Sequence, residues 1–104
     1  MAEENKTVLS SAQVDEALET LEGWSRSEAV LARHFVFQNF EEITSFLNHL
    51  VRAITAQNHH PDFSLNTGLQ MVSVALSTQS EQAITLSDIE FARALNAWAR
   101  GVSA

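Results

Sequence analysis

Apolar side chains recur along the chain with two different periods, and this change of period divides the sequence into predicted helices and strands. Spacings of three and four residues are typical of a helix that buries one face. They occur in three segments that begin near residues 11, 40 and 86. The apolar positions are Val14, Leu18 and Leu21 in the first segment, Phe40, Ile43, Phe46, Leu47, Leu50, Val51 and Ile54 in the second, and Leu86, Ile89, Ala92, Leu95 and Ala99 in the third.

Polar residues mark the expected starts of these helices. Ser10 or Ser11 is expected to cap the first helix and Asn39 the second, because their side-chain oxygens can accept hydrogen bonds from N–H groups of the first turn. Thr85 precedes the third helix, and Asp88 follows three residues later. This Thr-x-x-Asp spacing is a variant of the capping box.

Glycine and proline mark the expected ends. Gly23 is a natural stop for the first helix and Gly101 for the third, because glycine readily adopts the left-handed conformation that follows a helix. The second helix should end near residues 57–58. Pro61 lies just beyond them, cannot contribute a helical N–H group and disfavours helix in the residue before it.

Alternating apolar and polar positions predict strands between the first two helices. Residues 30–37 alternate, and a short strand near Trp24 is expected to pair with them as a hairpin. A polar turn at residues 26–28 should join the two strands. The side chains expected to share one face of the longer strand are Leu31, Arg33, Phe35 and Phe37.

A second alternating segment lies before the third helix. A loop containing residues 66–68 leads to residues 69–78, in which apolar side chains alternate, and residues 83–84 are the candidate for a short final strand. Closely spaced strands between helices predict an α+β fold, an antiparallel sheet with the helices on one face. A chain of 104 residues suits one domain. We assign it to residues 9–104 and expect residues 1–8 to be flexible.

Composition and charge exclude several classes of partner. Six Lys and Arg against thirteen Asp and Glu give a net charge of −7, so nucleic acid and anionic membrane surfaces are disfavoured. The chain has no cysteine, which removes disulfides and thiolate chemistry and suits a reducing interior. Residues 1–6 have no leader-like pattern and no apolar run is long enough for a membrane span. We therefore expect a cytoplasmic protein.

The strongest candidate for chemistry is the run His59-His60-Pro61, at the expected end of the second helix. Imidazole titrates near neutral pH, so a histidine pair in a cleft can exchange protons with a ligand. Adjacent residues in extended backbone point in opposite directions, so one can act on a ligand while the other braces the loop. The competing interpretation is structural, because histidines at a helix C-terminus can cap its carbonyl groups.

The remaining histidines and the prospect of a metal site carry less weight. Neighbouring histidines rarely converge on one ion, and His59 and His60 have no carboxylate cluster or His-Glu-x-x-His motif beside them. We therefore predict no metal and no cofactor. His34, on a predicted strand, and His49, on the outer side of the second helix, are expected to be surface residues.

Several short motifs together resemble the pterin-4a-carbinolamine dehydratases. These motifs are Gly23-Trp24, the Phe-x-Phe at 35–37, Asn39-Phe40-Glu41-Glu42, Asn58-His59-His60-Pro61-Asp62, Leu76-Ser77-Thr78, and Asp88 with Ala92. The resemblance implies the family's fold, a four-stranded antiparallel sheet backed by three helices, and a homodimer joined through sheet edges. It also implies that His59 and His60 are the catalytic acid and base, with Asp88 at the family's aspartate position.

Three positions depart from the family pattern. Thr55 replaces an acidic residue, Gln79 replaces a third histidine, and Ser87 replaces an arginine that often precedes the aspartate. Glutamine cannot exchange a proton near neutral pH, and threonine cannot stabilise a charged imidazole as a carboxylate does. Loss of one general acid or base commonly costs about 10²- to 10⁴-fold in rate. The Asp88 side chain is also explained by the capping box alone.

Two functions follow from these observations. The first, which the sequence favours, is a non-catalytic member with a degenerate site that acts on a protein client. It resembles the branch that assembles RuBisCO in α-carboxysomes, which implies carboxysome association. The alternative is an active 4a-hydroxytetrahydrobiopterin dehydratase in pterin recycling. In that case His59 is the main acid/base with His60 as its partner, while the substrate contacts come from Asn58, Ser77, Thr78, Gln79 and Asp88.

Overall fold

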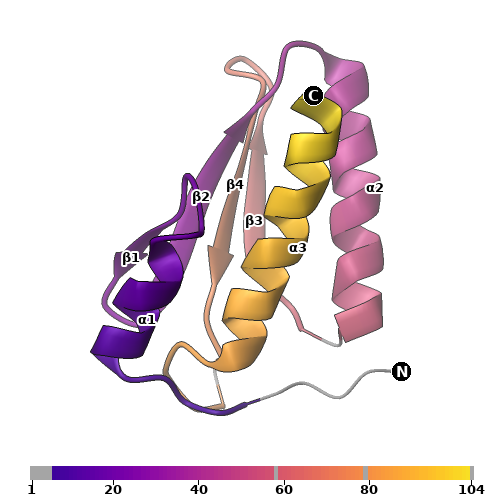
Figure 1. Cartoon of the computed structure of the whole chain (residues 1–104). Coiled ribbons are helices and arrows are strands. Elements are labelled where there is room, and N and C mark those ends of the chain that lie inside the picture. The colour runs from indigo at the N-terminus through magenta and orange to yellow at the C-terminus, as the bar shows by residue number, and fades with distance from the viewer. Residues whose placement is uncertain (1–5, 58, 79, 104) are drawn as a thin grey trace.

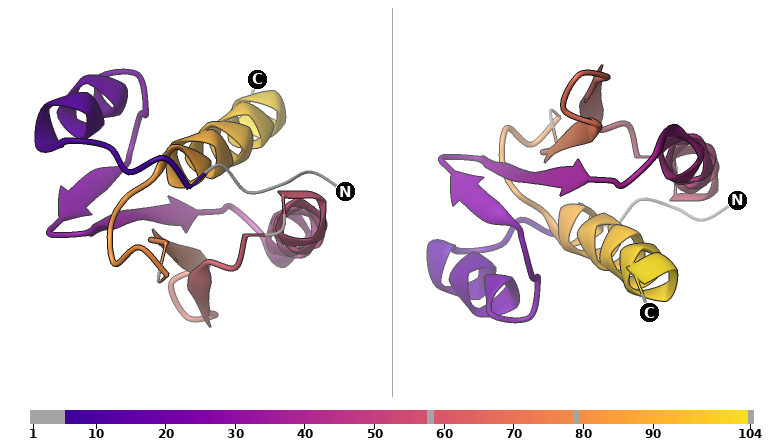
Figure 2. Two further views of the ribbon diagram at one scale, coloured as in Figure 1. Left: turned by 90° about the horizontal axis from the view of Figure 1, so that it is seen from below. Right: turned by 90° about the horizontal axis from the view of Figure 1, so that it is seen from above.

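The computed structural model describes residues 6–57, 59–78 and 80–103, with residues 100–103 described by their backbone alone. Its helices are α1 (Ser11–Leu18), α2 (Phe40–Gln57) and α3 (Leu86–Ser103), and its strands are β1 (Ser25–Ser27), β2 (Val30–Val36), β3 (Asp62–Asn66) and β4 (Met71–Leu76). The strands form one antiparallel sheet in the order β1-β2-β4-β3 (Figure 1). The three helices cover one face of this sheet (Figure 2). The predicted α+β class is confirmed.

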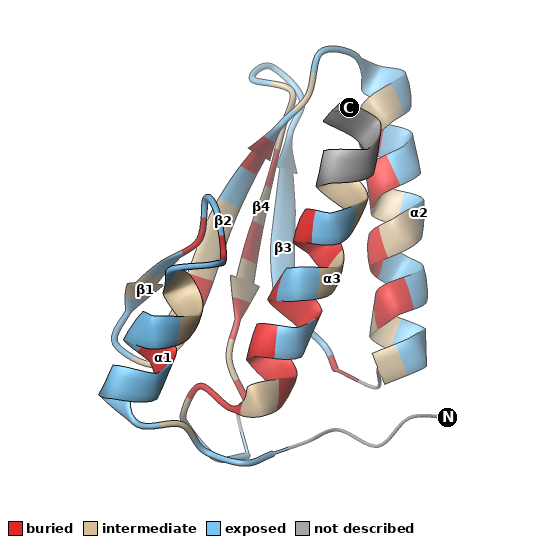
Figure 3. Cartoon of the chain, in the orientation of Figure 1, coloured by how far each residue is buried: buried red, intermediate tan, exposed pale blue. Residues whose placement is uncertain are grey.

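The core lies between that sheet face and the helices. β4 shows it most simply, because Val72, Val74 and Leu76 are buried while the residues between them are half-buried. Buried side chains of α2 and α3 face the same interior (Figure 3). None of the helices formed by the described residues is long and apolar enough to cross a membrane.

The first helix begins where the sequence predicts but ends earlier than predicted. Ser10 is its cap: the Ser10 hydroxyl accepts a hydrogen bond from the Gln13 N–H group, and the Gln13 side chain accepts one from the Ser10 N–H group. The helix ends at Leu18 rather than at Gly23. Gly23, with φ of 85°, instead shapes the turn that leads into the sheet, and Leu21 is buried in the segment between.

The first hairpin forms with a shorter turn than expected. Arg26 and Ser27 were predicted as turn residues, but they lie in β1 and pair with Leu31 and Val30. The reversal falls at Glu28, whose φ is 55°. Polar side chains are compatible with a strand here because β1 is an edge strand with its side chains largely exposed.

The second helix matches its predicted bounds but not the full width of its predicted apolar stripe. Asn39 caps it, because its Oδ1 atom accepts a hydrogen bond from the Glu42 N–H group. Phe40 and Val51 are each 54% exposed, because α2 lies at the side of the molecule and only one of its faces meets the core. His49 was expected at the surface, but it is half-buried and its ring stacks on Trp98 with centroids 5.6 Å apart.

The second hairpin contains a strand, β3, that was not predicted from the sequence. β3 occupies Asp62–Asn66, part of which was expected to be loop, and it pairs with β4. Every residue of β3 is exposed, and its only apolar residues, Phe63 and Leu65, alternate with polar ones over just five positions. The predicted final strand at residues 83–84 is wrong: Ala83 makes only an isolated bridge to Thr78.

The third helix begins as predicted but continues through Gly101 to Ser103. Its start is paired with the N-terminal segment. Val8 forms an antiparallel bridge with Thr85, so this part of the segment that was expected to be flexible lies beside the beginning of α3.

Candidate functional site

The two adjacent histidines diverge at the junction between α2 and β3. His59 lies two residues after the end of α2, and its side chain is turned into the protein, where the residue is 2% exposed. His60 is exposed to solvent. The junction therefore offers one accessible imidazole and one that is fixed in the interior, as expected for neighbours in extended backbone.

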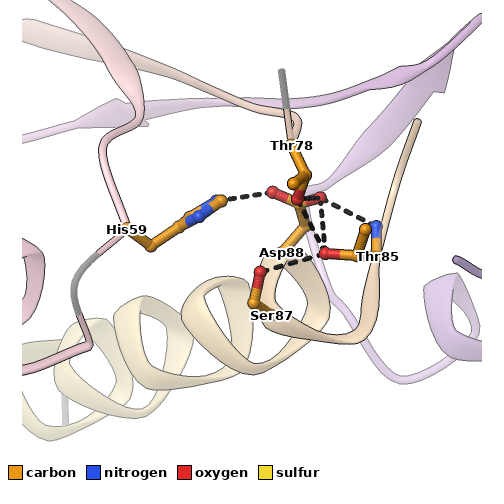
Figure 4. Close-up of polar contacts among 5 residues, drawn as sticks. All are labelled: His59, Thr78, Thr85, Ser87 and Asp88. Carbon is orange, nitrogen blue, oxygen red and sulfur yellow. Dashed lines mark hydrogen bonds and ion pairs between the residues drawn. The ribbon is translucent and has the colours of Figure 1, made fainter. Parts of the chain in front are cut away.

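Asp88 is the partner of the buried histidine. The Nε2 atom of His59 lies 2.6 Å from Oδ1 of Asp88, whose side chain has no exposed surface (Figure 4). The other carboxylate oxygen, Oδ2, accepts hydrogen bonds of 2.9 Å from the Thr78 hydroxyl and from the Thr85 N–H group. Both oxygens of the buried carboxylate are thus hydrogen-bonded, which offsets the cost of burying it.

Hydroxyl groups extend this network along the start of α3. Oγ1 of Thr85 lies 2.7 Å from Oγ1 of Thr78 and 3.0 Å from Oγ of Ser87. Because the Thr78 hydroxyl donates to Asp88, it accepts from Thr85, and the Thr85 oxygen can in turn accept from Ser87. We call His59, Thr78, Thr85, Ser87 and Asp88 the Asp88 cluster. All five side chains are buried.

Asp88 makes the capping contact that the sequence predicts, but this contact does not account for all of its bonds. The bond from the Thr85 N–H group to Oδ2 is the reciprocal half of a capping box. A cap needs only that contact, however, whereas the other oxygen contacts His59, which lies 29 residues away in the sequence. Asp88 therefore also fixes the orientation of an imidazole. The ring of Phe91 packs beside that imidazole, with the two ring centroids 5.7 Å apart.

The other predicted site residues are distributed around this cluster. Ser77 is half-buried and immediately precedes Thr78, while the Thr78 hydroxyl is turned inward to Asp88. Asn58 and Gln79 lie outside the described residues. Thr55 is exposed, and its hydroxyl donates to the Val51 carbonyl within α2.

Two members of the cluster were not predicted as site residues. Thr85 was identified only as a helix cap, and Ser87 only as a departure from the family pattern. The available signal was the run Thr85-Leu86-Ser87-Asp88 itself, in which three side chains with oxygen atoms gather at one helix start. Their convergence on His59 depends on tertiary structure and could not be read from that run.

No metal centre is indicated near the cluster. Within residues 6–57, 59–78 and 80–103, no group of three or more His, Asp or Glu side chains is placed to hold an ion. A cavity of about 300 Å³ lies near the other end of α3, where Arg33, Phe37 and Trp98 line it, and none of the predicted site residues that the structure describes contributes to its lining.

Comparison with known proteins decides the family. A family model described as "Pterin 4 alpha carbinolamine dehydratase" matches residues 7–98, a range that includes every residue of the candidate site. The chain belongs to this family. The matched range includes the His59-His60-Pro61 run.

Individual relatives agree with this assignment. A protein of Mycobacterium avium (strain 104) is 34% identical over 89 residues, covering 86% of this chain and 93% of the relative. A protein of Rhodopseudomonas palustris (strain BisB18) is 36% identical over 89 residues, covering 84% and 86%. Both carry the name "Putative pterin-4-alpha-carbinolamine dehydratase".

A solved structure confirms the fold. The crystal structure described as a transcriptional coactivator/pterin dehydratase from Brucella melitensis superposes with a TM-score of 0.81 at 30% identity. The match covers 88% of this chain and 97% of the Brucella chain. The four-stranded sheet with three helices is therefore a fold that this chain shares with the Brucella protein.

Proposed function

We propose that this pterin dehydratase family member eliminates water from a 4a-hydroxytetrahydropterin at the His59–His60 junction. The observation that supports this most directly is the pair formed by His59 and Asp88. A helix cap does not require a buried imidazole on the second carboxylate oxygen, and burying two such polar groups is costly unless they are fully hydrogen-bonded. Such an arrangement is typical of a site in which an imidazole must be held in one orientation.

The reaction needs two proton transfers. The C4a–O bond breaks as the leaving hydroxyl takes up a proton and departs as water, while N5 loses its proton and a C4a=N5 double bond forms. His60 is the accessible imidazole and is our candidate for exchanging these protons. His59, held by Asp88, fixes the loop on which His60 lies.

Four residues, His59, His60, Thr78 and Asp88, have different roles in this proposal from those expected from the sequence. We now place His60 rather than His59 as the principal acid/base, because His59 is almost fully buried. Thr78 and Asp88 become positioning residues, since their polar atoms are bonded within the cluster. Ser77 remains a candidate substrate contact, and Asn58 and Gln79 remain the candidates that the sequence names.

The test is a dehydratase assay on freshly generated 4a-hydroxytetrahydropterin, with His60→Ala beside the parent chain. We expect the substitution to lower the rate by about 10²- to 10⁴-fold without changing the stability of this exposed position. His34→Ala is the matched control, because His34 is also an exposed histidine but lies on β2. Equal rates for His60→Ala and the parent would remove His60 from the mechanism.

A second candidate function is the assembly of a protein client, for which RuBisCO is the expected example. Gln79, Thr55 and Ser87 in place of charged or titratable residues favour it, as does the apolar surface exposed on α2. This function predicts no turnover above background for the parent chain. It also predicts that His60→Ala leaves the yield of assembled client unchanged, so the same variant separates the two functions.

We also propose that the chain forms a homodimer by pairing β3 edges. β3 is an edge strand exposed at each of its five residues, with Phe63 45% and Leu65 39% exposed. The strand contains neither Lys nor Pro, which commonly protect an edge from pairing, and its one charged residue is Asp62 at the start of the strand. Two antiparallel copies of β3 would extend the sheet and cover both apolar side chains.

A further inference from the structure

The N-terminal segment is joined to the residues that begin α3. The Leu9 N–H group donates a hydrogen bond of 3.1 Å to the Ile84 carbonyl, and the Leu86 N–H group donates one of 3.0 Å to the Thr7 carbonyl. These two bonds flank the bridge between Val8 and Thr85. The backbone of Thr85 is therefore held on both sides by residues 7–9.

Thr85 connects this segment to the Asp88 cluster through two separate groups. Its N–H group donates to Oδ2 of Asp88, and its hydroxyl lies 2.7 Å from the hydroxyl of Thr78, which also donates to Oδ2. The opposite carboxylate oxygen contacts His59. The path from the N-terminal segment to the imidazole consists only of backbone pairing and hydrogen bonds between buried groups.

We propose that Thr85 is a positioning residue for His59 and that residues 7–9 are the clamp that holds Thr85 in place. This inference rests on the proposed function, because the His59 imidazole that Thr85 positions belongs to the proposed site. The physical reason is that a carboxylate bonded by three groups takes the orientation that all three allow. A shift of Thr85 therefore turns Asp88, and the contact between Asp88 and His59 changes with it.

The sharpest test removes one hydrogen bond of the clamp and little else. Leu86 is the first residue of α3, where a helix tolerates proline because the N–H group there is not used within the helix. Leu86→Pro therefore removes the donor to the Thr7 carbonyl. Thr85, the residue before it, is a helix cap, a position whose usual extended conformation is compatible with a following proline. Leu86→Ala is the matched control, because it shortens the same side chain but keeps the N–H group.

Two measurements are made on each full-length variant. The imidazole signals of His59 in ¹H–¹⁵N NMR spectra report the contact with Asp88 independently of activity. We expect them to shift or broaden in Leu86→Pro and to stay near the parent's in Leu86→Ala. Turnover of the 4a-hydroxytetrahydropterin should fall by about tenfold in Leu86→Pro relative to Leu86→Ala, since small displacements of a site residue cost rate steeply.

A second pair of variants covers the case in which Leu86→Pro does not fold. Thr85→Val keeps the backbone and the shape of the side chain but removes the hydroxyl, and Thr85→Ser keeps the hydroxyl. The proposal predicts altered His59 signals in Thr85→Val and recovery in Thr85→Ser. Unaltered His59 signals in Thr85→Val, or in a folded Leu86→Pro, would overturn it. Altered signals with no turnover in the parent would support the clamp while refuting the proposed dehydratase.

Discussion

Nε2 of His59 and Oδ1 of Asp88 lie 2.6 Å apart in the interior, and the two residues lie at opposite ends of two different helices. His59 follows the C-terminal end of α2, and Asp88 lies in the first turn of α3. The bond therefore joins the two long helices of the fold at the level of the candidate site. Its energy contributes both to stability and to the geometry of the junction.

Replacing Asp88 with asparagine is expected to lower the free energy of unfolding by about 2 to 4 kcal/mol, because it removes the buried charge that these hydrogen bonds stabilise and its amide N–H group can bond His59 only if the imidazole changes tautomer. Urea denaturation of the two proteins measures this difference. Asp62→Asn is the control, since Asp62 is exposed on β3 and should change stability by no more than about 0.5 kcal/mol. Equal denaturation midpoints for Asp88→Asn and Asp62→Asn would show that the cluster contributes little to stability.

Features that depend on neighbouring residues were predicted from the sequence, whereas features that depend on tertiary packing were not. Three of the four buried positions of α2 (Ile43, Phe46 and Leu50) and the caps Ser10 and Asn39 depend on neighbours within a few residues, and the pattern predicted them. β3 was not predicted because its alternation, Phe63 and Leu65 among polar residues, covers only five exposed positions, which is too short to separate a strand from the expected loop. The approach of Asp88 to His59 depends on how α2 and α3 pack, which no local pattern contains.

The family resemblance supplied what the residue pattern could not. It named His59, His60 and Asp88 together, although only the fold brings Asp88 near either histidine. It did not indicate which histidine is accessible, because burial at the junction is decided by the direction of the chain after α2. Exposure of His60 and burial of His59 are findings of the structure.

Gly23 is expected to be the glycine least tolerant of substitution in the described part of the chain. Its φ of 85° is unfavourable for other residues, and a Cβ atom there would lie 2.6 Å from Nε of Arg33. Gly23→Ala should therefore lower the free energy of unfolding by about 1 to 3 kcal/mol. At Gly68 the nearest atom to an added Cβ is Oδ1 of Asn66 at 3.6 Å, an ordinary contact.

Gly68→Ala is consequently the matched control, with an expected change within about 1 kcal/mol in either direction. Thermal and urea denaturation of both variants provide the measurement. A loss in Gly68→Ala as large as that in Gly23→Ala would contradict the argument from φ and from the approach of Arg33.

Asn96 is expected to be a second sensitive polar position. Its Oδ1 atom accepts hydrogen bonds of 2.7 Å from the Trp24 indole and 2.6 Å from the Arg33 guanidinium, and its Nδ2 group donates to the Glu22 carbonyl at 3.0 Å. Asn96→Leu removes the acceptor for the buried indole N–H group. We expect a loss of about 2 to 4 kcal/mol, combining the lost bonds with an unpaired buried donor.

Asn96→Asp tests whether this loss comes from the acceptor. Aspartate keeps an oxygen for Trp24 and Arg33 and loses only the donor to Glu22, so it should destabilise the protein less than Asn96→Leu does. Urea denaturation midpoints rank the variants. If Asn96→Asp proves the less stable of the two, the donor to Glu22 or the new buried charge dominates instead.

The proposed dimer can be tested by placing a charge on its edge. Leu65→Lys adds a lysine to β3, a substitution that natural proteins use to prevent edge pairing, and Ser25→Lys adds the same charge to β1 at the opposite edge of the sheet. We expect the parent and Ser25→Lys to sediment as dimers and Leu65→Lys to sediment as a monomer. Because Leu65 is an exposed edge residue, its replacement should leave the monomer folded, which circular dichroism checks. A dimer that persists in Leu65→Lys but dissociates in Ser25→Lys would assign the interface to β1, and a monomeric parent would refute edge pairing altogether.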